Sequence, residues 1–94
     1  MSAHKVDYSK CPLPNLAAGL QLYLEHGIQP GTFLARVLQN DLEGAVLHAN
    51  PHSFARLGEL VLWMVREVPL SAWGSRDTYE HVVSTGGYHP VRAA

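Results

Sequence analysis

The sequence predicts an all-α fold, a compact array of about five helices with a long central helix and an extended N-terminal arm. Apolar residues recur at three- and four-residue spacing through most of the chain, which is the period of one helix face. Asp41, Asn50 and Ser75 each precede such a segment, where a side-chain oxygen can cap the first N–H groups of a helix. No alternating run is long enough to demand a sheet.

The N-terminal arm covers residues 1–14, which contain two prolines and no helical period. A first helix is then predicted over 15–26, and Gly27 follows where a left-handed C-cap is needed. Pro30 and Gly31 begin a second helix of about ten residues, because the fixed φ of proline suits a first helical turn. With one glycine and no lysine after it, this corner is structural and not a phosphate loop.

The third predicted helix, 42–49, follows the cap at Asp41. Its apolar face comprises Leu42, Ala45, Val46 and Ala49. The longest helix is predicted over 51–68, because Asn50 followed by proline is a strong helix start. Its core-facing stripe comprises Phe54, Leu57, Leu60, Val61, Met64 and Val68.

The last helix begins after Ser75 and is closed by the pair Gly86-Gly87. Residues 88–94 are expected to form a loose tail. A chain of 94 residues has the length of one domain, so residues 1–94 are taken as a single helical domain.

Composition excludes several classes of function. The chain is 47% hydrophobic and 16% charged, as ordinary globular proteins are, and its net charge of −1 gives no global attraction to nucleic acid or acidic membranes. Cys11 is the only cysteine, so no disulfide forms within the chain and a reducing compartment fits best. The longest apolar run, 60–65, is far below the roughly 20 residues of a membrane span. We expect a cytoplasmic protein that does not cross a membrane.

Two pairs of residues have the spacing of chemical sites. His48 and His52 are four apart, but Asn50 starts a new helix between them, so we expect surface histidines and no metal site. Asp77 and His81 lie one turn apart, either as a catalytic dyad or as a solvated ion pair. Since Ser75 serves better as a helix cap than as a nucleophile, we expect no catalytic residues, no cofactor and no enzyme.

A helix-turn-helix is a further interpretation, because the second and third predicted helices are short and joined by a tight turn at Asn40-Asp41. The helix that would read DNA begins with Asp41, Leu42 and Glu43, which brings two carboxylates toward the phosphates. Nucleic acid is therefore an unfavoured partner, and a small DNA-binding regulator stays only as an alternative.

The candidate binding residues include both tryptophans. Trp63 lies off the main stripe of its helix and serves either the core or, with Leu62 and Arg66, an interface with another chain. Trp73 lies in the loop before the last helix. It either locks that helix to the central one or stacks on a ligand.

Two arginines and a tyrosine complete the candidate set. Arg36 and Arg66 can meet an anionic ligand or a carboxylate of a partner, or pair with Glu59 or Glu67 on a solvated surface. Tyr23, on the first helix, is the sixth candidate.

Four segments of the chain together form a recognisable pattern. They are Tyr-Leu-Glu-His-Gly-Ile-Gln-Pro-Gly-Thr-Phe-Leu at 23–34, Val-Leu-Gln-Asn-Asp-Leu at 37–42, Trp-Gly-Ser at 73–75 and Gly-Gly at 86–87. This pattern resembles a group of small proteins encoded by bacteriophages, prophages and plasmids. Where such proteins often have Ser-Pro-Glu, this chain has Ser-Arg-Asp at 75–77, so the start of the last helix is expected to be less rigid. The resemblance implies an accessory protein of a mobile element that acts by binding in the bacterial cytoplasm.

Two functional hypotheses follow. The first is an interaction module that occupies a host protein, for example against host defence, or self-associates into a homo-oligomer. The second is a small-ligand binder, such as a sponge for cyclic nucleotides. The first predicts an exposed apolar face around Trp63. The second predicts a pocket where an aromatic side chain meets Arg36, Arg66 or Arg76.

Overall fold

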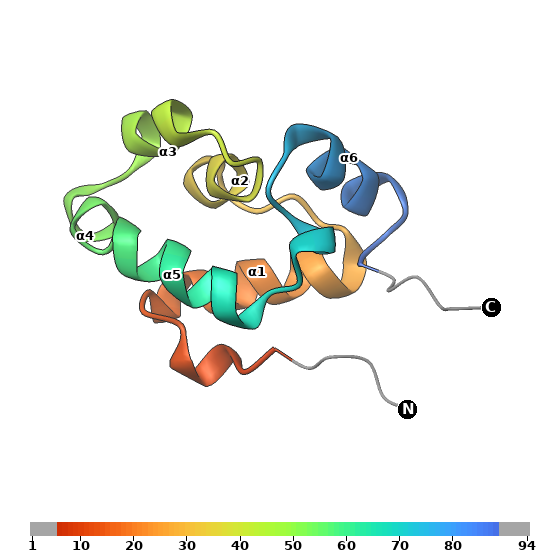
Figure 1. Cartoon of the computed structure of the whole chain (residues 1–94), viewed down its shortest axis with the longest axis horizontal. Helices are drawn as coiled ribbons and strands as arrows, with labels where there is room; N and C mark the ends of the chain where they lie inside the picture. Colours follow the sequence, from red (N-terminus) through yellow and green to blue (C-terminus); the bar gives the residue numbers. More distant parts are fainter. Residues whose placement is uncertain (1–5, 89–94) are drawn as a thin grey trace.

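The computed structural model describes residues 6–88, and this part of the chain forms six α-helices and two 3₁₀ turns, without a strand. It confirms the predicted all-α fold (Figure 1). The helices are α1 (Pro14–His26), α2 (Thr32–Leu38), α3 (Leu42–His48), α4 (Pro51–Ala55), α5 (Leu57–Glu67) and α6 (Arg76–Ser84). The 3₁₀ turns are η1 (Tyr8–Lys10) and η2 (Leu70–Ala72).

All three predicted caps are in place. The side chains of Asp41, Asn50 and Ser75 each accept a hydrogen bond from the backbone N–H three residues later, at 3.0, 2.7 and 3.1 Å. Gly27 ends α1 with a φ of 67°, the left-handed conformation that glycine adopts without strain. Helix α2 starts after Gly31 and is shorter than predicted, with seven residues.

The prediction of one continuous helix over 51–68 is wrong, because this segment is divided into α4 and α5 at Arg56. Arg56 has φ −111° and ψ 11°, outside the helical region. Gly58, in the next turn, weakens the helix there. As a result Phe54 is 58% exposed instead of lying in the core, and α1, with 13 residues, is longer than α5, with 11.

The predicted face of the third helix is also wrong in part. Only Ala45 of α3 is buried, while Leu42 is 70% exposed and Val46 is exposed as well. Figure 1 shows α3 and α4 at one end of the molecule, with α6 at the other end. Helix α3 packs on α2, and a seven-residue helix at the end of the array has one side to bury.

The predicted arm and tail lie only partly within the described residues. Residues 1–5 and 89–94 fall outside that part of the chain. The rest of the arm contains the turn η1, and its residues Cys11 and Leu13 are buried against the core. Tyr88 is held by its backbone N–H, which donates to the carbonyl of Leu24 at 2.6 Å.

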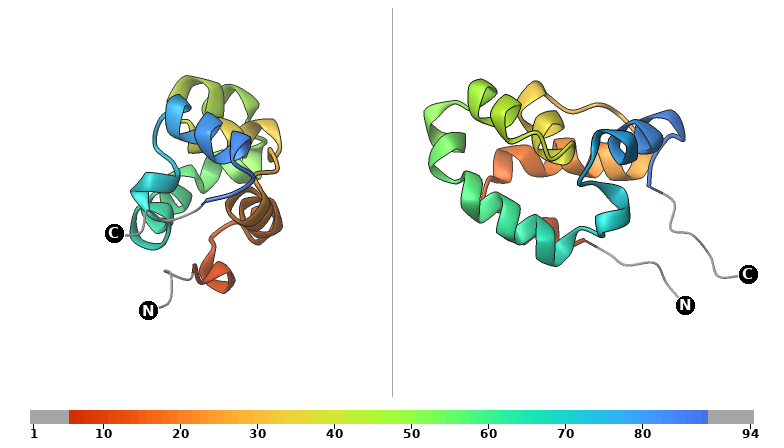
Figure 2. Two further views of the ribbon diagram at one scale, coloured as in Figure 1. Left: turned by 90° about the vertical axis from the view of Figure 1, so that its right-hand side faces the viewer. Right: turned by 45° about the horizontal axis from the view of Figure 1, so that its top comes forward.

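The core draws side chains from every α-helix except α4. Figure 2 shows the arrangement of these helices in two further views. Its largest fully buried side chains are Leu13, Leu20, Tyr23, Leu38, Leu60, Met64 and Val82. The aromatic rings of Tyr23 on α1 and Tyr79 on α6 are stacked, with centroids 5.3 Å apart. This contact holds α6 beside α1 and close to the connection that leads into α2.

Candidate functional site

A pocket of about 420 Å³ lies between α2 and α6. On each side of the pocket, four lining residues stand at positions i, i+3, i+4 and i+7, the spacing that places side chains in a row along one helix face. The row on α2 is Thr32, Ala35, Arg36 and Gln39, and the row on α6 is Arg76, Tyr79, Glu80 and Val83. In the row on α2 the last residue, Gln39, is the C-cap directly after the helix. Gln29 and Pro30 from the connection before α2, and Ser84 at the end of α6, complete the lining.

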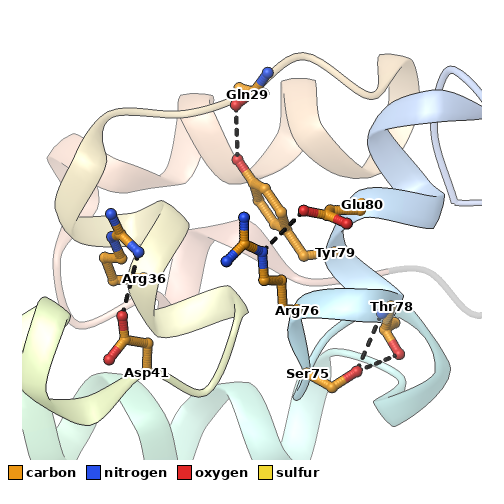
Figure 3. A network of polar contacts seen from close by, with 8 residues as sticks. All are labelled: Gln29, Arg36, Asp41, Ser75, Arg76, Thr78, Tyr79 and Glu80. Carbon is orange, nitrogen blue, oxygen red and sulfur yellow. Dashed lines mark hydrogen bonds and ion pairs between the residues drawn. The ribbon is translucent and has the colours of Figure 1, made fainter.

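Arg36 is held in place by the turn between α2 and α3. Its Nη1 lies 3.3 Å from Oδ2 of Asp41, as the network in Figure 3 shows. The other carboxylate oxygen of Asp41 accepts from the backbone N–H of Gly44, so the cap of α3 also orients this carboxylate. The remaining N–H donors of the guanidinium are not used by this ion pair.

Arg76 lies in the first turn of α6, and its Nε donates to Oε2 of Glu80 at 2.9 Å (Figure 3). This hydrogen bond, together with the nearby negative charge, raises the pKa of the guanidinium, which keeps its positive charge. Both side chains are largely exposed, and an exposed i,i+4 pair contributes little to stability because solvent screens the charges. Arg76 can therefore leave Glu80 at little cost.

Tyr79 contributes its hydroxyl to the pocket more than its ring. The residue is buried and its ring stacks on Tyr23, while its hydroxyl donates to Oε1 of Gln29 at 3.4 Å. Burial raises the pKa of Tyr79, so the phenol stays neutral at neutral pH. It supplies a hydrogen-bonding group without an open aromatic face.

The six candidate binding residues predicted from the sequence lie in three different parts of the structure. Arg36 lies in the pocket, whereas Leu62 and Arg66 lie exposed on α5, away from it. The remaining three, Tyr23, Trp63 and Trp73, are buried. Within the core, the hydroxyl of Tyr23 donates to the carbonyl of Ala72 at 2.7 Å, and Nε1 of Trp73 donates to the carbonyl of Val68 at 3.3 Å.

Sequence reasoning missed Gln29, Gln39 and Glu80, and it named Arg76 only as an alternative. The signal available was the repeated i, i+3, i+4, i+7 row on each helix, opposite the apolar stripe. That signal marks a polar face but does not show which two helices turn their polar faces toward each other.

The two residue pairs with catalytic or metal spacing lie on the surface of the described part of the chain. His48 ends α3 and His52 lies in α4, and no three potential ligands come together among residues 6–88. Asp77 and His81 are both exposed on α6. None of the helices described there has the length and hydropathy to cross a membrane.

Comparison with models of protein families, with curated proteins and with solved structures finds no match. The resemblance to proteins of mobile elements therefore stays an expectation. The function has to be inferred from the geometry and charge of the pocket and of the molecular surface.

Proposed function

We propose that the protein is a non-enzymatic binding protein that holds a small phosphate-bearing ligand in the pocket between α2 and α6. The observation that carries this proposal is the convergence of Arg36 and Arg76, from two facing helices, on one pocket. The side-chain amides of Gln29 and Gln39 lie in the same lining. Hydrogen bonds from guanidinium groups to phosphate are among the strongest in proteins, because the charge assists them.

The ion pairs already present support this role. Asp41 lies 3.3 Å from Arg36 in a partly exposed pair, which favours one orientation of the guanidinium before a ligand arrives and so reduces the side-chain entropy lost on binding. Arg76 exchanges an exposed pair with Glu80 for a phosphate group at little cost. Because Glu80 also lines the pocket, it disfavours ligands whose negative charge extends toward it.

The size and lining of the pocket narrow the ligand class. A volume of about 420 Å³ lies within the range of roughly 300–1,000 Å³ found for small-molecule sites. The ring of Tyr79 is buried against Tyr23, so a nucleobase has no stacking platform on it. The ligand is then recognised through its phosphate and its hydrogen-bonding groups, as in a sugar phosphate or a nucleotide held by its phosphate end.

The biological setting is part of the same proposal. A small protein that binds a phosphorylated signalling molecule without converting it acts as a sponge for that molecule. Together with the resemblance to proteins of bacteriophages and plasmids, this supports an accessory protein in the bacterial cytoplasm. The hydroxyl of Ser84, in the pocket wall, donates to the backbone carbonyl of His81, which fits a structural role better than that of a nucleophile.

The first prediction concerns this pocket. Calorimetric titration with inorganic phosphate, nucleoside monophosphates, cyclic nucleotides and sugar phosphates should find a ligand whose affinity falls at least about tenfold in Arg36→Gln and in Arg76→Gln, as expected for loss of one charge-assisted hydrogen bond. Lys10→Gln, the same change of charge on η1, should leave the affinity unchanged. Equal binding by all three variants, or no binding by the wild-type protein, would contradict the proposal.

A second candidate function is the occupation of a host protein. It is favoured by apolar side chains that are exposed on α3 and α4, the two helices at one end of the molecule in Figure 1: Leu42 and Leu47 on α3 and Phe54 on α4. Exposed apolar patches commonly mark protein interfaces. Native mass measurement with and without host lysate, on the wild type and on Leu47→Glu, distinguishes this function, because only a patch-dependent complex is lost in the variant.

A further inference from the structure

Helix α5 has two opposite faces. Leu60, Trp63 and Met64 are buried in the core. On the other side lie five exposed residues, which we call the outer face: Gly58, Glu59, Leu62, Val65 and Arg66. Leu62 is 50% exposed and Val65 is 54% exposed, so this helix presents apolar side chains both to the core and to solvent. A Cβ added at Gly58 would have no atom within 4 Å, so the surface beside it is open.

The outer face is symmetric about its centre. Leu62 is the middle residue of α5, which runs over Leu57–Glu67. At 100° per residue, Gly58 and Val65 lie on one side of Leu62, and Glu59 and Arg66 lie on the other side. Each side thus has one residue three or four positions before Leu62 and one three or four positions after it.

We propose that a second copy of the chain docks on the outer face, with the two α5 helices antiparallel and a two-fold axis at Leu62. Such an axis places Leu62 against Leu62 of the other copy. Because each side of the face is preserved while the direction of the helix is reversed, Val65 meets the open surface at Gly58, and Arg66 meets Glu59. Every residue of the face thereby finds a complementary partner.

Charge complementarity favours a second copy of the chain as the occupant of the outer face, and it favours the antiparallel direction of the two α5 helices. The two-fold axis creates two Arg66–Glu59 pairs between the copies, so a second copy supplies the charges that this face needs. A parallel pairing would instead bring Arg66 to Val65 and leave Glu59 against Gly58. In the single chain Glu59 lies 3.2 Å from Arg56 in an exposed pair, so it can share its carboxylate with a second arginine.

The area of contact indicates a weak dimer. An 11-residue helix is only about 16 Å long, while a standard interface buries about 800 Å² on each partner. Two further apolar residues, Phe54 on α4 and Leu70 on η2, are exposed just beyond the two ends of α5, eight residues before and eight residues after Leu62. Antiparallel docking brings Phe54 of one copy to the end of α5 where the other copy has Leu70.

Sedimentation equilibrium tests the proposal over protein concentrations up to about 1 mM. The wild-type chain should change from 10.3 kDa to twice this mass as the concentration rises. Arg66→Glu and Glu59→Arg should each raise the dimer Kd at least about tenfold, because each places two like-charged pairs in the interface. The double variant should restore the wild-type Kd within about threefold, because it reverses both pairs.

The control is Leu42→Glu, an equally drastic change at an exposed leucine of α3, which should leave the dimer Kd unchanged. Circular dichroism checks that every variant is folded. A wild-type chain that stays at 10.3 kDa, single reversals without effect, or a double variant that is not restored would each overturn the proposal. None of these residues lines the pocket between α2 and α6, so either proposal can fail without the other.

Discussion

Leu62 and Trp63 are neighbours in the chain, yet they lie in opposite environments. Trp63 is 8% exposed, while Leu62 lies on the outer face of α5. Nε1 of Trp63 is buried and has no hydrogen-bond partner among the described residues, so the indole contributes apolar contact alone. The sequence left Trp63 open between core and interface, because a residue at the flank of an apolar stripe is buried only if a neighbouring element reaches it.

The second prediction compares glutamate at these two positions. Trp63→Glu should lower the free energy of unfolding by on the order of 3 kcal/mol or more, because a carboxylate replaces a large buried ring. Leu62→Glu should change it by no more than about 0.5 kcal/mol, as at other exposed sites. Urea unfolding followed by circular dichroism, in dilute solution, measures both. Wild-type stability in Trp63→Glu would mean that this ring is not part of the core.

The third prediction concerns the stacked pair of Tyr23 and Tyr79. Burial raises the pKa of both phenols above the ordinary value of 10.0. The neutral phenols are therefore favoured in the folded state. Their contribution to stability is complete below about pH 10, and it is lost as the pH rises through the folded-state pKa, because the unfolded chain ionises first. We expect the free energy of unfolding to fall steeply above about pH 10.

Tyr23→Phe separates the two roles of this residue. At neutral pH the variant should lose about 1 kcal/mol, because the carbonyl of Ala72 loses its hydrogen bond from the hydroxyl. Its stability should then fall less steeply between about pH 8 and about pH 11 than that of the wild type, since one phenol no longer titrates. Urea unfolding at these pH values provides the measurement, and parallel curves for the two proteins would refute the assignment.

At the scale of elements, the ends of helices α1 and α6 meet at two glycines. A Cβ on Gly27 would lie 2.7 Å from the backbone N of Gly87 and 2.8 Å from the carbonyl oxygen of Val82. The φ of Gly27 is also positive, which disfavours any other residue. The fourth prediction is that Gly27→Ala lowers the free energy of unfolding by about 2 kcal/mol or more.

Gly31→Ala is the matched control for this prediction. Gly31 has a φ of −59°, and a Cβ there would have no atom within 4 Å. Alanine should therefore change the stability by no more than about 1 kcal/mol, and it should leave ligand binding intact. Thermal unfolding compares the two variants. Equal losses in both would mean that the crossing of α1 and α6 does not depend on Gly27.

The boundaries of elements could be predicted largely from local signals. Asp41, Asn50 and Ser75 mark helix starts because capping involves only residues within one turn. The break at Arg56 could not be predicted, because Phe54 continues the apolar spacing across it and only the tertiary structure leaves that ring in solvent. The pocket could not be predicted either, because it also depends on the tertiary structure. Arg36 and Arg76 are far apart in sequence, and no local pattern shows that α2 faces α6.

At the scale of the whole molecule, size limits stability. A domain of 94 residues buries roughly 65% of the surface that its unfolded chain exposes, which leaves a small margin. Anything that binds only the folded state then raises the melting temperature measurably. The pocket and the outer face of α5 are two separate places where such binding can occur. Binding in the pocket makes the melting temperature depend on the ligand concentration, whereas dimerisation makes it depend on the protein concentration.

The last prediction uses this difference. If the folded chains dimerise through α5, the melting temperature should rise with protein concentration, by about 3–5 °C for each tenfold increase above the dimer Kd. Leu62→Glu should abolish this dependence, whereas Leu42→Glu should keep it.

A ligand of the pocket should raise the melting temperature of all three proteins, including the monomeric variant, because none of the changed residues lines the pocket. Differential scanning calorimetry over a hundredfold range of concentration, about 10 µM to 1 mM as in the sedimentation experiment, measures both effects. A wild-type melting temperature that does not vary over this range would contradict dimerisation. A ligand shift that is lost only in Leu62→Glu would place the ligand at the dimer interface and not between α2 and α6.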